Sequence, residues 1–153
     1  MSEISFYHCT RSKPFDVLPV LAAKALDAGH KVAVHSPDTA ELDALDRHLW
    51  TFDPGSFLPH GRDAAKHQPV LLTDRFEAEN GASLLISVGG RLPGDTSTFA
   101  RVLYLFDGED AEAMTTARAH WRALASRDDV TPVYWSQGER GWQRAGTVEG
   151  RGQ

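Results

Sequence analysis

The stretch that decides the fold is ISFYHCTRSKPFDVLPVLAAKALDAGHKVAVHS, residues 4 to 36. It begins with a short aromatic run, Ile4–Cys9, of the kind typical of a β-strand. A segment follows that predicts a helix ending near Gly29, because its apolar residues recur at helical spacing: Leu18, Leu21, Ala22 and Ala25. The apolar run Lys31–Ser36 predicts a second strand. This order predicts a pair of parallel strands with a right-handed connection.

Pro19 restricts where this first helix can begin. Proline has no amide hydrogen and its ring clashes with the preceding turn, so it is well tolerated only in the first turn of a helix. We therefore expect the helix to begin near Asp16.

The rest of the chain continues the alternation of strands and helices. Residues 37–50 carry leucines at helical spacing and early acids, and residues 109–129 predict a third helix, acidic at its start and basic later. Further strands are expected at Pro69–Asp74, Ser83–Gly90 and Arg101–Gly108, and two short ones within residues 131–146. Nearly continuous apolar strands indicate a sheet covered on both faces. The sequence predicts an α/β fold, a three-layer sandwich around a mostly parallel sheet.

Size and composition indicate one globular domain. The chain has 153 residues, of which 41% are hydrophobic and 24% charged. We expect the domain to occupy residues 1–146 and the polar residues 147–153 to form a flexible tail. The net charge of −5 argues against direct binding of nucleic acid, although it leaves room for a local basic patch. No signal peptide or membrane-spanning run is evident, so we expect a cytoplasmic protein.

The sequence has no motif for a metal site or a phosphate-binding loop. Cys9 is the only cysteine, and the seven histidines show no metal-binding spacing, so we expect no metal site. The junction after the first strand, residues 7–16, has no glycine, and the glycines of residues 87–98 lack a Gly-Lys-Ser/Thr ending. We therefore expect no phosphate-binding loop and no cofactor. Asp107 or Asp110 is better interpreted as the cap of the third helix.

An enzyme on the same sheet remains the alternative hypothesis. Cys9 stands where a small phosphatase has its nucleophile, but Phe15 occupies the position of the arginine that such an enzyme needs. No GxSxG motif supports a serine hydrolase, whereas a dispersed Ser–His–Asp triad leaves no local pattern to detect. A nucleotide-binding or hydrolytic enzyme therefore stays open beside a non-catalytic function.

Two segments are candidates for binding a partner. In the third helix Arg118 and Trp121 are neighbours at i, i+3, and Arg122 follows one turn after Arg118. An arginine beside an aromatic ring suits capture of a peptide carboxylate next to an apolar side chain, whereas the simpler interpretation is a core tryptophan and a solvated arginine. The irregular segment DRHLWTFDPGSFLPHG, residues 46–61, carries Trp50 and Phe57, which either cover the sheet or line a pocket.

The same residues carry a resemblance to a known family. The pattern LDALDRHLW…SFLPHG, preceded by FYH and AGHKVAVHS, resembles the chi subunit of bacterial DNA polymerase III, and SLLISV and ARAHWRA agree in order and spacing. The similarity runs from about residue 4 to about residue 146. It implies a Rossmann-like fold and a non-catalytic accessory subunit of the clamp loader.

The resemblance also implies partners and a binding site. The partners are the psi subunit of the clamp loader, where one is present, and the acidic, Phe-ending tail of the single-stranded-DNA-binding protein. The tail carboxylate is expected at Arg118, with Trp121 at the family's aromatic position and Trp50 and Phe57 lining the apolar side.

One departure from the family affects the expected tail site. Chi proteins have a second basic residue one helical turn before the arginine, where this chain has Met114. The missing charge is then expected from Arg122, Arg62 or Lys66, or tail binding is weaker.

Overall fold

A computed structural model describes residues 2–51, 60–61, 68–77, 79–94, 98–139 and 141–145, including all their side chains except those of Trp50, Thr51 and Ala145. The helices are α1 (Pro14–Asp27), α2 (Thr39–Thr51) and α3 (Ala111–Ala125). The strands are β1 (Ser2–Cys9), β2 (Val32–His35), β3 (His60–Gly61), β4 (Val70–Thr73), β5 (Leu84–Ser87), β6 (Arg101–Asp107), β7 (Val130–Gly138) and β8 (Gly141–Ala145). Residues 147–153, the expected tail, lie outside the described part.

The strands form one eight-stranded sheet in the order β3-β4-β2-β5-β6-β1-β7-β8. All neighbours run parallel except β7 and β8, which form an antiparallel hairpin. The mostly parallel sheet is therefore confirmed. The prediction that the first two strands form a pair is wrong, because β5 and β6 lie between β2 and β1. The short strand β3 was not predicted, since two residues leave no periodic pattern.

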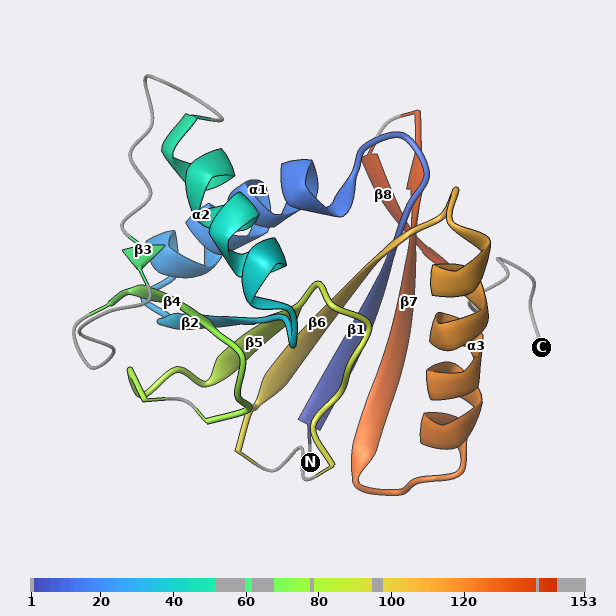
Figure 1. The fold of residues 1–153 in the computed structure, drawn as a ribbon. Helices are drawn as coiled ribbons and strands as arrows, with labels where there is room; N and C mark the ends of the chain where they lie inside the picture. Colours follow the sequence, from blue (N-terminus) through green and yellow to red (C-terminus); the bar gives the residue numbers. More distant parts are fainter. Residues whose placement is uncertain are drawn as a thin grey trace.

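Helices cover the sheet on both sides, as Figure 1 shows: α1 and α2 lie on one face and α3 on the other. The leucine stripe of α2, namely Leu42, Leu45 and Leu49, packs into the core on the first face. Ala117 and Leu124 of α3 pack with Phe6, Tyr104 and Tyr134 on the second face. This arrangement confirms the three-layer α/β sandwich.

The start of α1 differs from the expectation. The helix begins at Pro14 rather than near Asp16, and Pro19 lies inside it. Pro14 suits the first helical position because its backbone φ is already helical and no helical hydrogen bond is required of its nitrogen. Pro19 interrupts the hydrogen-bond ladder beyond the first turn, but its ring is buried in the core. Burial of the ring offsets part of the cost of the missing bond.

Asp110 begins α3 as its N-cap, which confirms one of the two aspartates proposed for that role. Its carboxylate accepts hydrogen bonds from the backbone amides of Glu112 and Ala113, at 3.0 and 3.2 Å. These amides belong to the first turn, where no helical carbonyl is available to them. Asp107 instead ends β6 and pairs with Lys13.

None of the helices in the described ranges has the length and apolarity to cross a membrane.

We expect Asp110→Ala to lower the free energy of unfolding by about 1 kcal/mol, because two amides of α3 lose their acceptor. Asp110→Ser should retain most of the stability, since serine also caps helices. Urea denaturation of the three proteins measures the difference. Equal midpoints for the alanine variant and the wild type would contradict a stabilising cap.

Candidate functional site

Arg118 and Trp121 lie on α3 where the helix meets the sheet, and both side chains are partly buried. The Trp121 ring packs edge-on against Phe6, with centroids 5.3 Å apart, and against Tyr134, with centroids 6.1 Å apart. One part of the indole is thus held by the core while another reaches the surface. Trp121 thus packs against the core, as the simpler interpretation expects, whereas Arg118 is only partly exposed to solvent.

His8 completes the cluster from the sheet below. Its ring stacks on Phe106 with centroids 5.0 Å apart, and its Nδ1 shares a hydrogen bond with the Tyr134 hydroxyl. Burial, followed by the nearby positive charge of Arg118, lowers the pKa of His8 below its usual value. We call His8, Arg118, Trp121 and Tyr134 the α3 cluster.

No local pattern in the sequence points to His8 or Tyr134. The two residues are 126 positions apart in the chain and meet because β1 and β7 are neighbours in the sheet. Arg122 is exposed one turn beyond Arg118, while Met114, one turn before it, packs against the core on this face. Met114 therefore contributes apolar packing at the position where chi proteins have a second base.

Of the predicted aromatic segment, residues 46–61, the structure describes residues 46–51 of α2 and residues 60–61 of β3. Trp50 belongs to α2, which packs on the opposite face of the sheet. The leucine stripe of α2 requires this placement, since it is buried against α1 and the strands beneath. The side chain of Trp50 and the residues Phe57, Arg62 and Lys66 lie outside the described part of the chain. The sheet thus separates the helix that carries Trp50 from Arg118.

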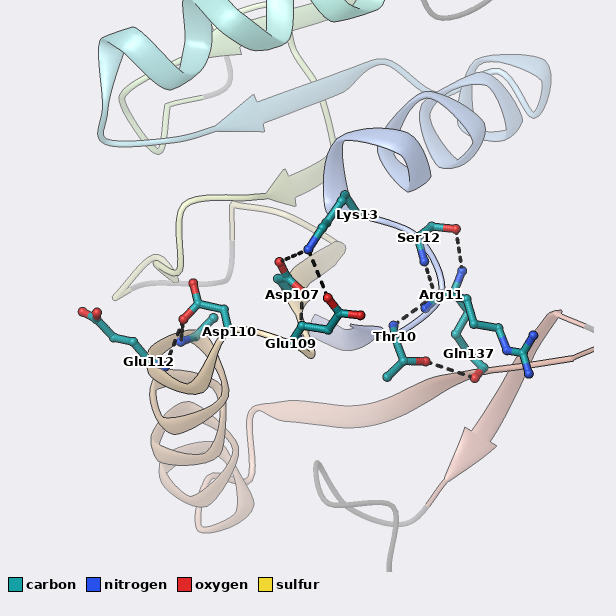
Figure 2. A network of polar contacts seen from close by, with 10 residues as sticks. Thr10, Arg11, Ser12, Lys13, Asp107, Glu109, Asp110, Glu112 and Gln137 are labelled. Carbon is teal, nitrogen blue, oxygen red and sulfur yellow. Dashed lines mark hydrogen bonds and ion pairs between the residues drawn. The ribbon is translucent and has the colours of Figure 1, made fainter.

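The loop between β1 and α1 lies at the carboxyl edge of the sheet, where nucleotides bind in related α/β folds. Figure 2 shows that the side chain of Gln137 in β7 reaches the loop between β1 and α1. Its Oε1 accepts hydrogen bonds from three consecutive backbone amides, those of Thr10, Arg11 and Ser12, at 3.1, 2.8 and 3.1 Å. Its Nε2 donates to the Ser12 hydroxyl at 3.1 Å. The chain's own amide group therefore satisfies the loop amides that would otherwise face a phosphate.

Acidic residues surround the same loop. Lys13 Nζ lies 2.9 Å from an Asp107 carboxylate oxygen and 3.6 Å from one of Glu109. The hydrogen bond from Lys13 is the main cause that holds the pKa of Asp107 below its usual value. The positive charge of Lys13 is thus neutralised by carboxylates of the same protein. Because acidic side chains surround the loop, the neutral amide oxygen of Gln137 is favoured there over a negatively charged phosphate.

Cys9 is buried, and it is unsuited to nucleophilic chemistry as it stands. Burial, together with the negative charge of Asp107, raises the pKa of the Cys9 thiol to about 12. Since the thiolate is the reactive form, a thiol with so high a pKa is inert near neutral pH. Among the described residues, no group of three or more His, Cys, Asp or Glu side chains is placed to hold a metal ion.

We expect Gln137→Ala to loosen the loop between β1 and α1. Three amides lose their acceptor, so their hydrogen exchange should accelerate and the free energy of unfolding should fall by about 1 kcal/mol. Gln143→Ala, a change of the same kind in the adjacent strand β8, should leave these amides unaffected. Unchanged exchange at Thr10, Arg11 and Ser12 in the Gln137 variant would show that the contact does not hold the loop.

We expect Arg118→Ala to raise the pKa of His8, because removing a nearby positive charge makes protonation of the imidazole easier. The pKa should stay below its ordinary value, since burial remains. An NMR titration of the His8 ring measures the shift, and Arg122→Ala on the exposed side of α3 is the control. An unchanged pKa in the Arg118 variant would place the guanidinium away from His8.

Comparison with known proteins gives one consistent family. The family model described as "DNA polymerase III chi subunit, HolC" matches residues 1–130, which end at the first residue of β7. A Pseudomonas aeruginosa protein named DNA polymerase III subunit chi is 33% identical over 115 residues, 72% of this chain and 81% of the relative. A Rickettsia prowazekii protein named probable DNA polymerase III subunit chi is 28% identical over 92 residues, 58% of this chain and 55% of the relative. The chain therefore belongs to the DNA polymerase III chi subunit family.

Proposed function

We propose that the chain is a non-catalytic accessory subunit of the DNA polymerase III holoenzyme that connects the clamp loader to the single-stranded-DNA-binding protein. In this proposal, the α3 cluster binds the acidic, Phe-ending C-terminal tail of that protein. The observation that carries it is the pairing of Arg118 and Trp121, both partly buried, at the boundary between α3 and the sheet. Membership of the chi family supports the assignment to the replication machinery.

The cluster offers the two chemistries that such a tail needs. A guanidinium binds a carboxylate through two parallel hydrogen bonds, and partial burial strengthens them by excluding water. The accessible part of the Trp121 indole provides an apolar surface for the terminal phenylalanine, while its other edge is fixed by Phe6 and Tyr134. The exposed Arg122 lies beside them to meet the acidic residues that precede the phenylalanine.

The overall charge is compatible with this function. A protein with a net charge of −5 gains little from contacting DNA directly, but it can bind a protein that already coats the DNA. A few charge-assisted hydrogen bonds and one buried ring correspond to micromolar affinity, on the order of −8 kcal/mol. Several tails on one coated strand increase the effective affinity, and salt weakens each contact.

The proposed tail site differs from the one expected from the family resemblance. It consists of Arg118, Trp121 and Arg122, with His8 and Tyr134 supporting them from the sheet. The backbone of α2 lies across the sheet from these residues, and the side chains of Trp50 and Phe57 lie outside the described part of the chain. We propose the psi subunit, where one is present, as the connection to the clamp loader, and no surface is assigned to it.

The alternative, a nucleotide-dependent or hydrolytic enzyme, has less support. The amides of the first loop are already bound by Gln137, and the pKa of the Cys9 thiol is raised to about 12. This alternative predicts stabilisation by ATP or GTP with magnesium. A clear rise of the melting temperature with either nucleotide would favour it over an accessory subunit.

We expect Arg118→Ala to weaken binding of an acidic peptide ending in Phe by about 2–5 kcal/mol, because the terminal carboxylate loses its charged partner. Calorimetric titration measures the change. Lys31→Ala, which removes one positive charge ahead of β2, should bind as the wild type does.

A second peptide tests the carboxylate itself. The same peptide with an amidated C-terminus should bind weakly to the wild type, and Arg118→Ala should weaken it little further, because the two changes remove one shared contact. Wild-type-like affinity of the Arg118 variant for the free-acid peptide would falsify the assignment of this residue. A different result would be that the amidated peptide does not bind and that the affinity for the free-acid peptide is the same with and without Arg118. The terminal carboxylate would then be bound by another residue.

A further inference from the structure

A separate pocket lies on the face of the sheet that carries α1, at the amino-terminal ends of β5 and β6. Its volume is about 330 Å³, and its walls include Tyr7 of β1, Trp135 of β7 and Trp142 of β8. Leucines from α1 and the strands form the remaining apolar lining. This volume is at the lower end of the range for ligand-binding sites. It suits a small molecule with one ring system rather than a protein partner.

The three aromatic rings have a definite arrangement. Tyr7 and Trp135 are paired across neighbouring strands and stack nearly parallel, with centroids 6.3 Å apart and an angle of 14°. Trp142 meets Tyr7 edge-on, with centroids 5.0 Å apart. Both tryptophans are only partly buried although they pack against the core. The pocket therefore exposes indole surface whose orientation is already fixed, which lowers the entropy cost of stacking a ligand ring.

One polar group of this wall lacks a partner. The indole Nε1 of Trp135 is buried and has no hydrogen-bond acceptor among the described residues. A buried N–H without an acceptor costs free energy, and such groups are rare in proteins. A ligand oxygen that accepts a hydrogen bond from this nitrogen would remove that cost.

Basic side chains stand around the aromatic wall. Lys24 lies in the last turn of α1, His30 follows that helix, and Arg101 begins β6. Arg101 is already paired with Glu3, at 3.0 Å, so part of its charge is used. Lys24 is exposed and forms no ion pair with an acid of the described residues. Lys24 is therefore the main positive charge at the rim of the pocket.

The pocket is distinct from the proposed tail site. It lies on the opposite face of the sheet from Arg118 and Trp121. Its two tryptophans also lie beyond residue 130, where the match to the chi family model ends. Membership of the family therefore assigns nothing to them.

We propose that this pocket binds a small molecule built of a flat aromatic ring and one anionic group, of the chemical class that includes nucleoside monophosphates and aryl carboxylates. The ring stacks on the indole of Trp142 beside Trp135, since aromatic faces accept any flat ring. The anionic group accepts hydrogen bonds from Lys24 and His30 at the rim. No bond is made or broken in this binding.

The test titrates the full chain with four probes, followed by NMR. Thymidine monophosphate and 1-naphthoate each carry a ring and a negative charge, whereas thymidine lacks the charge and inorganic phosphate lacks the ring. The first two should bind saturably at millimolar concentration or below, and the last two at least about tenfold more weakly. Binding by only one of the charged ring compounds identifies whether phosphate or carboxylate is the preferred anion.

Substitutions in the pocket and outside it show where the charged ring compounds bind. Trp142→Ala should weaken the charged ring compounds about tenfold or more, because it removes the stacking surface. Trp142→Phe should restore part of the affinity, which separates loss of the surface from loss of the fold. Gln143→Ala, on the same strand, and Arg118→Ala, on the other face, should bind as the wild type does. Lys24→Ala should weaken the charged compounds selectively, to about the level of thymidine.

Two results would overturn the proposal. One is the absence of saturable binding by both charged ring compounds at millimolar concentration. The other is binding that is equal in the Trp142→Ala and Gln143→Ala proteins, which would place the ligand elsewhere. Neither result bears on the tail site, because the peptide titrations depend on Arg118 and not on Trp142.

Discussion

The burial of β1 on both faces is the constraint on which the rest of the structure depends. Alternate residues of this central strand face opposite layers, with Ile4 and Phe6 toward α3 and Tyr7 and Cys9 toward α1. A parallel strand of this kind is stable only when both faces are covered, because each carries a row of apolar side chains. The helices must therefore divide between the two faces. That division separates α2, with Trp50, from α3, with Arg118.

Side chains of β7 also face the two layers in turn. Tyr134 faces the α3 cluster and contacts His8 and Trp121, while its neighbour Trp135 faces the pocket beneath α1. Two residues beyond Trp135, Gln137 fixes the loop between β1 and α1. The strand β7 therefore contributes side chains to both proposed binding surfaces. It also holds the loop after β1, which in nucleotide-binding folds binds phosphate. Because successive side chains of a strand point to opposite faces, the two surfaces can differ in chemistry without interfering.

Much of the fold could be predicted from local patterns. Helical spacing located the three helices of the described residues, and continuous apolar runs located the central strands. The cap of α3 was narrowed to Asp107 or Asp110, and the structure shows that it is Asp110. The pairing of Arg118 with Trp121 also follows from spacing alone, because residues three apart in a helix are neighbours. The start of α1 was misplaced because the rule for proline was applied to Pro19, whereas Pro14 occupies the position that the rule describes.

The sequence by itself determined the class of fold and the neighbouring positions of Arg118 and Trp121 on one helix, and its motifs carried the resemblance to the family. These features depend on residue type and on spacing within one element, which the chain records directly. Only the tertiary structure decided the strand order, the meeting of His8 with Tyr134, the capture of three loop amides by Gln137, and the side of the sheet on which α2 lies. Each joins segments far apart in the chain, and packing of the whole core selects such contacts, since no local periodicity encodes them.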